Sequence, residues 1–245
     1  MLVTYPFITL TLAGFIIFFA FFIRSLTGFG GALISVPLLA LLFDLKFAVP
    51  FEAIFDIGVS LILIGSVYRQ INKSTLLPLL LGALIGTTVG SAMLNLMADN
   101  FLKNLLGLSI IIFALNLLRK PDDSGRSLAD YWGGVAGGIG GFFGGLFGTS
   151  GPPFVIYLSY KVKEKNALRA SLIGLFTFDG LWRFGLFAYN GLITREMIGL
   201  AMLLMPALCL GALLGHRMHL QVGEMRFRQI VAAILFISGG LLLLR

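Results

Sequence analysis

The stretches TGFGG (residues 27–31) and GTSGPP (residues 148–153) interrupt two long apolar segments of this 245-residue chain. Glycine and proline at this density break a helix, and bare lipid cannot hydrogen-bond the backbone amides that the break exposes. Such breaks persist in membrane proteins where they are packed in protein or line a wet cavity that holds a ligand. Matched breaks in two halves of one chain therefore predict the position of a binding site.

The composition is that of a membrane protein. Hydrophobic residues make up 58% of the sequence and charged residues 12%, and the mean hydropathy is +0.98. These few polar residues cannot cover the surface of a soluble globular protein of this length. We therefore expect the chain to lie in the lipid bilayer. The hydropathy pattern predicts ten helical segments, with approximate ranges 6–26, 30–43, 47–68, 76–97, 101–118, 131–147, 151–160, 167–189, 197–215 and 227–244.

Two of these segments, 30–43 and 151–160, are too short to cross a bilayer as straight helices, because a span needs about 20 residues at about 1.5 Å each. Each follows one of the two breaks. A first segment, a break and a short second segment therefore form a broken pair in each half of the chain.

The two halves resemble each other. The first break aligns with the second, and a Gly-x-x-x-Gly pair at 86–90, which allows close approach of helices, aligns with another at 211–215. We therefore predict a single transmembrane transporter domain over residues 1–245. It contains one repeat over about 1–118, a polar linker at 119–130 and a second repeat over about 131–245.

The distribution of lysine and arginine predicts the orientation, because cytoplasmic loops are usually rich in these residues. If each broken pair enters and leaves on one face, a single side of the membrane receives the basic loops 69–73, 119–126, 161–169 and 217–228. The opposite side then receives only Lys46, Lys103, Arg195 and Arg245. If each broken pair is instead one crossing, the basic residues divide almost evenly between the sides.

The first arrangement satisfies the charge rule. We therefore expect an all-α, multi-pass membrane protein with both termini outside. Each half contributes three spanning helices and a broken pair, for about 8 to 10 transmembrane segments. An odd number of crossings in each half makes the repeats inverted, as in many secondary transporters. The count of charges does not distinguish a hairpin from two short spans.

The breaks are the first candidate for a binding site. A short helix that follows a break begins with amides that lack intrahelical acceptors, and its N-terminus carries partial positive charge. Two such starts facing each other near the midplane would bind an anion. The alternative is that the glycines only permit tight packing, which is the interpretation we prefer for the eight glycines between 133 and 145. The candidate binding residues at the breaks are Thr27, Gly28, Gly30, Gly31, Gly148, Thr149, Ser150 and Gly151.

Ionisable residues inside apolar segments are the second candidate, because a charge at the bilayer centre costs roughly 2.5–3.5 kcal/mol. Asp56 and Asp179 lie in the middle of corresponding segments of the two halves. Arg183 lies one helical turn beyond Asp179 and can pair with it, and Arg24 precedes the first break, where it can meet the anion or Asp56. We expect the arginines to bind the anion and the aspartates to act as counter-charges or in proton coupling. Purely structural ion pairs are the alternative.

The remaining polar residues indicate less. We expect Glu52 and Lys46 to lie nearer an interface, in contact with water. Ser150 also suits the residue before a helix, with the prolines after it in the first turn. The two histidines, at 216 and 219, lack a third ligand, so we predict no metal and no cofactor.

The sequence around both breaks resembles the glycine-rich signatures of the TauE/SafE sulfite exporter family. GFGGALISVPL (28–38) is similar to the first signature and GFFGGLFGTSGPPF (141–154) to the second, and the similarity covers nearly the whole chain. The second signature departs from the commoner Gly-Gly-Gly form by carrying TSGPP at 149–153. The resemblance implies export or uptake of sulfur-containing anions, such as sulfite or organosulfonates, across the bacterial inner membrane.

Our prediction is a secondary transporter, not an enzyme, that moves a small anion by alternating access at the two breaks. A passive anion channel is the first alternative. An intramembrane serine hydrolase using Ser150 and His216 is a weaker one, because Pro152 replaces the last glycine of the G-x-S-x-G pattern. We expect no nucleic-acid partner, since membrane orientation accounts for the net charge of +7. A homodimer is compatible with the sequence.

Overall fold

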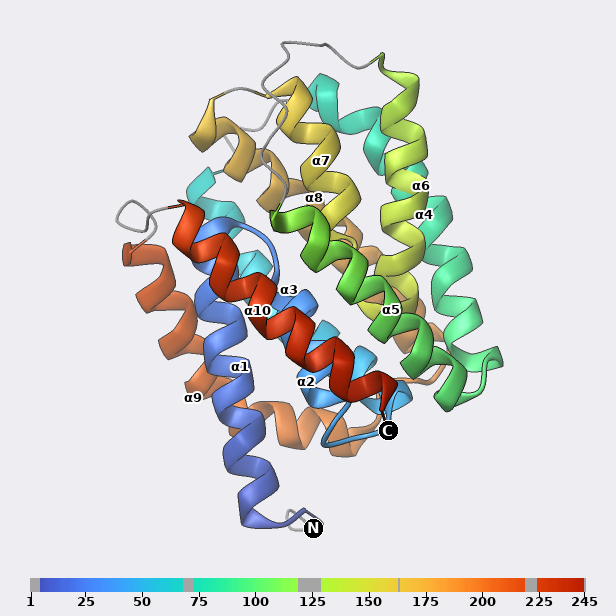
Figure 1. The fold of residues 1–245 in the computed structure, drawn as a ribbon, viewed down its shortest axis with the longest axis vertical. Coiled ribbons are helices and arrows are strands. Elements are labelled where there is room, and N and C mark those ends of the chain that lie inside the picture. Colours follow the sequence, from blue (N-terminus) through green and yellow to red (C-terminus); the bar gives the residue numbers. More distant parts are fainter. Residues whose placement is uncertain (1–4, 68–72, 119–128, 163, 219–223, 245) are drawn as a thin grey trace.

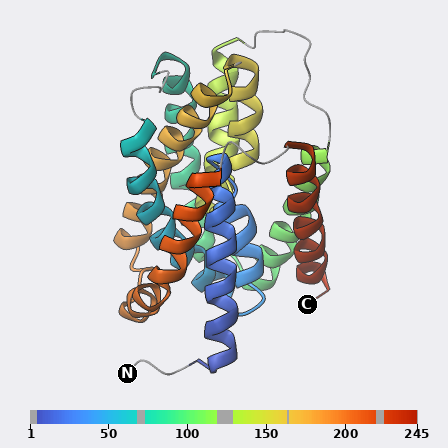
Figure 2. The same ribbon diagram turned by 90° about the vertical axis from the view of Figure 1, so that its left-hand side faces the viewer.

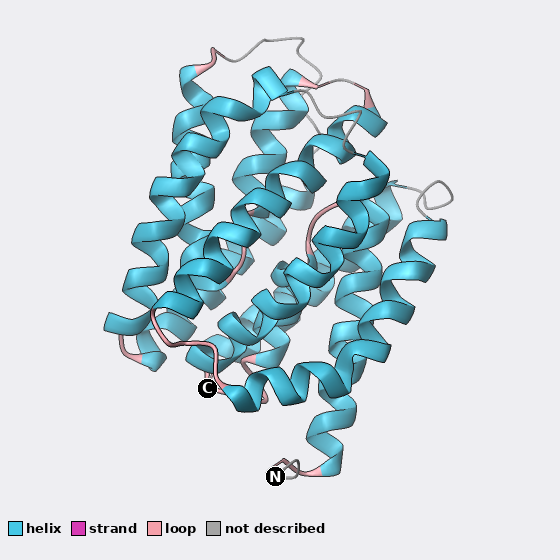
Figure 3. Ribbon diagram, turned by 180° about the vertical axis from the view of Figure 1, so that it is seen from behind, coloured by secondary structure: helices cyan, strands magenta, loops and turns pink. Residues whose placement is uncertain are grey.

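The computed structural model describes residues 5–67, 73–118, 129–162, 164–218 and 224–244, which form a bundle of helices (Figures 1 and 3). No strand occurs within these ranges. The helices are α1 (Phe7–Thr27), α2 (Gly31–Leu39), α3 (Leu45–Val67), α4 (Lys73–Leu96), α5 (Asp99–Leu118), α6 (Tyr131–Phe147), α7 (Gly151–Lys161), α8 (Lys165–Tyr189), α9 (Arg195–Met218) and α10 (Glu224–Leu243).

Each predicted segment corresponds to one of these helices. The two helices that follow the breaks are the shortest, with nine residues in α2 and eleven in α7. At about 1.5 Å per residue they are roughly 14 and 17 Å long, about half the hydrocarbon thickness of a bilayer. Among the described residues, four helical stretches are long and apolar enough to span a membrane: 7–27, 45–65, 75–96 and 195–218.

The helices of the two halves pack against each other in a reciprocal pattern. The first helix of each half contacts the fourth helix of the other, so α1 packs along α9 and α6 packs along α4. The third helices, α3 and α8, contact each other, and so do the fifth helices, α5 and α10 (Figure 2). In Figure 1, α1 runs upward from the N-terminus and α6 runs downward from the linker.

Glycines produce the closest of these contacts, as the Gly-x-x-x-Gly pattern predicts. A methyl group added to Gly86 would collide with the backbone carbonyl of Gly138, so α4 and α6 touch backbone to backbone. Gly211 has the same relation to the carbonyl of Phe18, where α9 meets α1. These contacts confirm that most of the glycines of α6 form a packing surface.

Large apolar side chains lie both inside and outside the bundle. Phe21, Phe51 and Phe55 are fully buried between the helices. By contrast Phe7 and Leu96 are each 83% exposed, as befits side chains that face lipid rather than water. A protein that shows bulky apolar side chains over its outer surface is suited to a membrane.

The start of α1 and the end of α10 lie toward one end of the bundle, and the start of α6, which follows the linker, lies at the opposite end (Figure 1). The side of the membrane on which the termini lie stays a prediction. Most of the linker, together with basic residues such as Arg69, Lys163 and Arg245, lies outside the described residues.

Candidate functional site

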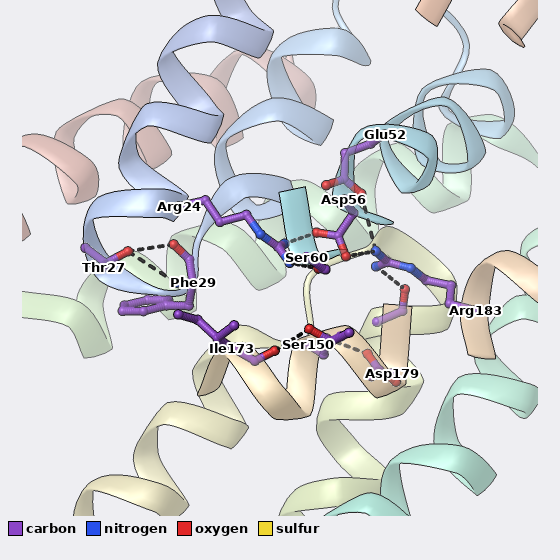
Figure 4. Close-up of polar contacts among 12 residues, drawn as sticks. Arg24, Thr27, Phe29, Glu52, Asp56, Ser60, Ser150, Ile173, Asp179 and Arg183 are labelled. Carbon is purple, nitrogen blue, oxygen red and sulfur yellow. Dashed lines mark hydrogen bonds and ion pairs between the residues drawn. The ribbon is translucent and has the colours of Figure 1, made fainter. Parts of the chain in front are cut away.

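The first break is a pair of left-handed turns between α1 and α2. Gly28 has a φ of 88° and Gly30 a φ of 89°. Residues that carry a Cβ rarely adopt this left-handed backbone conformation. The amide of Gly28 closes α1 by donating to the carbonyl of Arg24 at 2.7 Å. The hydroxyl of Thr27 contacts the carbonyls of Ile23 and Phe29, so it stabilises the break from within (Figure 4).

The second break has one left-handed glycine, Gly148, with a φ of 73°. Its amide donates to the carbonyl of Gly144 at 2.7 Å, and α7 then begins at Gly151. Ser150 precedes the helix, as predicted, but its side chain does not cap the helix amides. The Ser150 hydroxyl instead donates to Asp179 Oδ2 at 3.0 Å (Figure 4).

The two breaks meet at one buried cavity in the centre of the bundle. A methyl group placed on Gly148 would come within 3.3 Å of the Cβ of Ala32, which shows how closely the breaks approach. The cavity volume is about 10 Å³, about the minimum that a single water molecule needs. Its lining residues are Arg24, Gly30, Gly31, Ala32, Leu33, Asp56, Gly148, Thr149, Ser150, Gly151, Phe176, Asp179 and Arg183.

Ten of the twelve predicted site residues therefore line the cavity. The two exceptions are Thr27, whose hydroxyl is used inside the break, and Gly28, which packs against Arg169 of α8. Arg169 in turn donates to the carbonyl of Ser25 at 2.7 Å, which satisfies a backbone acceptor near the end of α1. These residues stabilise the break and do not face the cavity.

Arg24 and Arg183 converge on Asp56 from opposite halves of the chain (Figure 4). Arg24 forms an ion pair with Asp56 and donates to the hydroxyl of Ser60 at 2.7 Å. Arg183 Nη2 lies 3.2 Å from Asp56 Oδ2. Side-chain exposure is 5% or less for both arginines and Asp56, so this is a buried cluster of charges.

The predicted pair of Arg183 with Asp179 is not what the structure contains. Although the two residues are one turn apart on α8, the guanidinium points to α3, where it contacts Asp56 and also Glu52 at 3.5 Å. Glu52 is fully buried, which corrects our expectation that it lies in contact with water. The guanidinium of a long side chain can bind two carboxylates of a neighbouring helix. Arg183 does so here and forms no ion pair with Asp179 of its own helix.

Asp179 has a different environment, made of hydroxyl groups. Thr87 of α4 donates to its Oδ1 at 2.6 Å and Ser150 donates to its Oδ2 at 3.0 Å. Gly144 of α6 leaves room for both groups, since a methyl group there would lie 2.9 Å from Ser150 Cβ and 3.3 Å from Asp179 Oδ2. Gly144 is therefore part of this site as well as of the α6 surface.

Glu52, Ser60 and Thr87 also contact the charged groups of this site and were not predicted from the sequence. The sequence pattern could have indicated Glu52 and Ser60, because they and Asp56 are spaced four residues apart. They therefore form one polar stripe on an apolar helix. Thr87 gave no such signal, since it is one hydroxyl among the small residues of α4. Phe176 was also missed; its ring lies 5.7 Å from the Arg24 guanidinium.

Some buried polar atoms at the cavity are left with no hydrogen-bond partner among the described residues. They include the hydroxyl of Thr149 and Nε of Arg183. Unsatisfied buried donors cost roughly 1–3 kcal/mol each, so a native site that keeps them is suited to a polar ligand.

No group of three or more potential metal ligands occurs in the part of the chain that the structure describes, and His219 lies outside it. His216 is in the last turn of α9 and does not line the cavity that contains Ser150. The Ser150 hydroxyl is thus hydrogen-bonded to the Asp179 carboxylate, whereas the hydrolase alternative requires a hydrogen bond to His216.

Comparison with known proteins identifies one family. The family model described as "Sulfite exporter TauE/SafE" matches residues 13–242, nearly the whole chain and both breaks. No curated protein and no solved structure gives a significant match.

Proposed function

We propose that this chain, which belongs to the TauE/SafE sulfite exporter family, is a secondary carrier that moves a small anion by alternating access. Its membership of a membrane transporter family agrees with the apolar helices of the bundle. The substrate that we propose is a sulfur oxyanion such as sulfite, or a small organosulfonate. It binds at the cavity between the starts of α2 and α7.

The observation that supports this site most strongly is the meeting of two guanidinium groups with two helix starts. The first amides of α2 lack intrahelical acceptors, and in the first turn of α7 the free amide is that of Gly151, because Pro152 and Pro153 have no N–H. Both helix starts carry partial positive charge. Arg24 and Arg183 add two full charges in a planar geometry that suits the oxygens of an oxyanion. The hydroxyls of Thr149 and Ser150 supply further donors at the same cavity.

The cavity is closed in this conformation. Its volume of about 10 Å³ accommodates less than a sulfonate group, and Asp56 occupies both guanidinium groups. An incoming anion therefore competes with the Asp56 carboxylate, and the breaks must separate to admit it. We propose that the two halves move relative to each other for this purpose.

The reciprocal packing of the helices supports such a movement. Pairing of α1 with α9 and of α6 with α4 is the pattern expected of two repeats that exchange their fourth helices. The opposite directions of α1 and α6 in Figure 1 agree with inverted repeats. We propose that rocking of these units opens the cavity to either side of the plasma membrane, with both termini outside.

Flux into proteoliposomes tests the proposal. Labelled sulfite and labelled isethionate, a small organosulfonate, are offered to vesicles with and without unlabelled substrate inside, and acetate serves as a comparison anion. We expect saturable uptake that unlabelled substrate inside the vesicle accelerates, because a carrier returns faster when loaded. If none of the three anions moves, the proposal fails; high conductance without trans-acceleration would favour the channel.

Gly151 offers a matched test of the site itself. A methyl group at this position would lie 3.6 Å from Phe29 and 3.8 Å from Phe176, which is ordinary contact, whereas a larger side chain would fill the cavity. We expect Gly151→Leu to lower flux by at least about tenfold, equivalent to about 1.4 kcal/mol, and Gly151→Ala to lower it far less. Equal flux in the two variants, both folded, would exclude the cavity as the site.

A further inference from the structure

Asp179 differs from Asp56 and Glu52, the buried carboxylates of α3, in having only hydroxyl partners. We infer that Asp179 takes up one proton each time the anion binds, and that Ser150 links the two events. This inference rests on the proposed anion site and names the ion that is coupled to it. It follows from the hydrogen bonds around Asp179 and from the charges that surround the cavity.

The hydroxyl of Ser150 cannot serve Asp179 and an anion at the same time. A serine has one O–H, and in the structure it is donated to Asp179 Oδ2. An ionised carboxylate has no proton to offer, so it keeps the Ser150 O–H directed at Asp179 Oδ2 and unavailable to an anion. Once Asp179 carries a proton on Oδ2, it donates to the Ser150 oxygen instead. The Ser150 O–H is then free to donate to an anion in the cavity that Ser150 lines.

Thr87 allows this exchange without disturbing the rest of the site. Its hydroxyl donates to Oδ1, the other oxygen of Asp179, at 2.6 Å. That bond survives when the proton sits on Oδ2, because Oδ1 remains an acceptor. The change is therefore confined to one proton and one reoriented hydroxyl.

The charges at the cavity favour the same coupling. Two arginines, Arg24 and Arg183, are accompanied by three carboxyl groups, those of Glu52, Asp56 and Asp179. With all five ionised the buried cluster is net negative, and an added anion makes it more so. A proton on Asp179 neutralises the cluster before the anion enters, which reduces the cost of a buried charge.

Asp179 is a better proton acceptor here than the two carboxylates of α3. Asp56 contacts both guanidinium groups and Glu52 contacts Arg183, and a neighbouring cation favours the ionised form of a carboxylate. Within the described chain, no lysine or arginine nitrogen lies within ion-pair distance of Asp179, although Arg183 is one turn away on the same helix.

Among the residues whose side chains the structure describes, the helices that pack against α8 add no other titratable group next to Asp179. From α3 the charged neighbours are Glu52 and Asp56, and Arg24 of α1 lines the same cavity. The contacts from α4 and from the second break are the Thr87 and Ser150 hydroxyls. The titratable residues of α6 and α7 lie in the first turn of α6 and the last two turns of α7. They are Tyr131, Tyr157, Tyr160 and Lys161.

Calorimetric titration of the wild-type protein with isethionate tests the inference directly. Isethionate stays ionised from mildly acidic to mildly alkaline pH, so any proton that is taken up belongs to the protein. Titrations in buffers of different ionisation enthalpy give the number of protons bound with each anion. We expect a value near one at alkaline pH, with affinity falling about tenfold per pH unit there. Binding without proton uptake would overturn the inference and leave the anion site intact.

If isethionate does not bind, sulfite is used in the same way at alkaline pH, where it is fully deprotonated. Absence of binding or flux for both anions is a failure of the proposed function, and is thereby distinguished from a failure of the coupling.

The variant Asp179→Asn removes the proton site and keeps the shape. An amide can donate to Ser150 as the protonated acid does, so we expect anion binding that no longer changes with pH. Asp44→Asn is the matched control, because the Asp44 side chain is 84% exposed and does not line the cavity, and it should keep the wild-type pH dependence. A folded Asp179→Asn protein that binds with the wild-type pH profile, or not at all, would contradict the inference. If the variant does not fold, the proton count of the wild type decides alone.

Discussion

Asp56 and Asp179 lie in the middle of the third helix of each half, yet their surroundings are opposite. Asp56 is held between two arginines and Asp179 between two hydroxyls. Both are 2% exposed, so burial does not distinguish them. The difference shows that two halves with the same order of helices can give the same residue type different tasks. In our proposal, Asp56 is a fixed counter-charge and Asp179 changes its charge.

The breaks show the same asymmetry. The first is closed on itself by Thr27 and uses two left-handed glycines, while the second uses one, and its serine reaches out to α8. We therefore expect the first break to be the more rigid of the two. The second, with Ser150 and Thr149, is where the cavity gains its hydroxyl donors.

The largest effect on stability should come from removing the negative charge of each aspartate in turn. Asp56→Asn leaves two buried guanidinium groups without their shared partner, which should cost about 3–5 kcal/mol of stability. Asp179→Asn removes no ion pair and should cost about 1–2 kcal/mol. Thermal unfolding of the two variants in the same detergent measures the difference. Equal losses would mean that the two sites are not distinct in the way described.

An intermediate effect is expected at the glycine contacts between the halves. Gly86→Ala would push α4 away from the backbone of α6, and Gly211→Ala would push α9 away from α1. Each should lower stability by about 1–3 kcal/mol. Gly185→Ala is the control, because nothing lies within 4 Å of a methyl group there and alanine favours a helix. A control as destabilised as the other two in thermal unfolding would remove this account of the packing.

The smallest effect should come from the hydroxyl of Thr87. Thr87→Val keeps the shape and removes the hydrogen bond to Asp179, at a cost of about 1 kcal/mol. Because that bond stabilises the ionised carboxylate, the pH at which anion binding is half lost should move upward. Ser109→Ala is the control, since that hydroxyl donates to a carbonyl of its own helix, α5, at 2.8 Å. A binding profile that moves equally in both variants would argue against a role for Thr87 at Asp179.

Much of the fold could be predicted because it follows from local patterns. The lengths of the apolar segments predicted the helices, and the positions of glycine and proline predicted the breaks and the two short helices. The packing of Gly86 and Gly211 followed from small-residue spacing. In each case the deciding information lies within a few residues of the feature.

The partners of the charged residues could not be predicted in the same way. Spacing on one helix suggested Asp179 for Arg183, but the partner comes from α3, more than one hundred residues earlier in the sequence. Only the packing of α3 against α8 decides which carboxylate the guanidinium reaches. Glu52 was placed near water for the same reason, since its burial depends on helices that the sequence does not position.

The central claim is that the two breaks together form one anion site. Selenite resembles sulfite in shape and charge and scatters anomalously, so a crystal structure with selenite locates the anion directly. The account predicts one anomalous peak between the starts of α2 and α7, within hydrogen-bonding distance of Arg24 or Arg183 and of Ser150. Selenite bound elsewhere in the bundle, with this cavity closed as it is now, would contradict it.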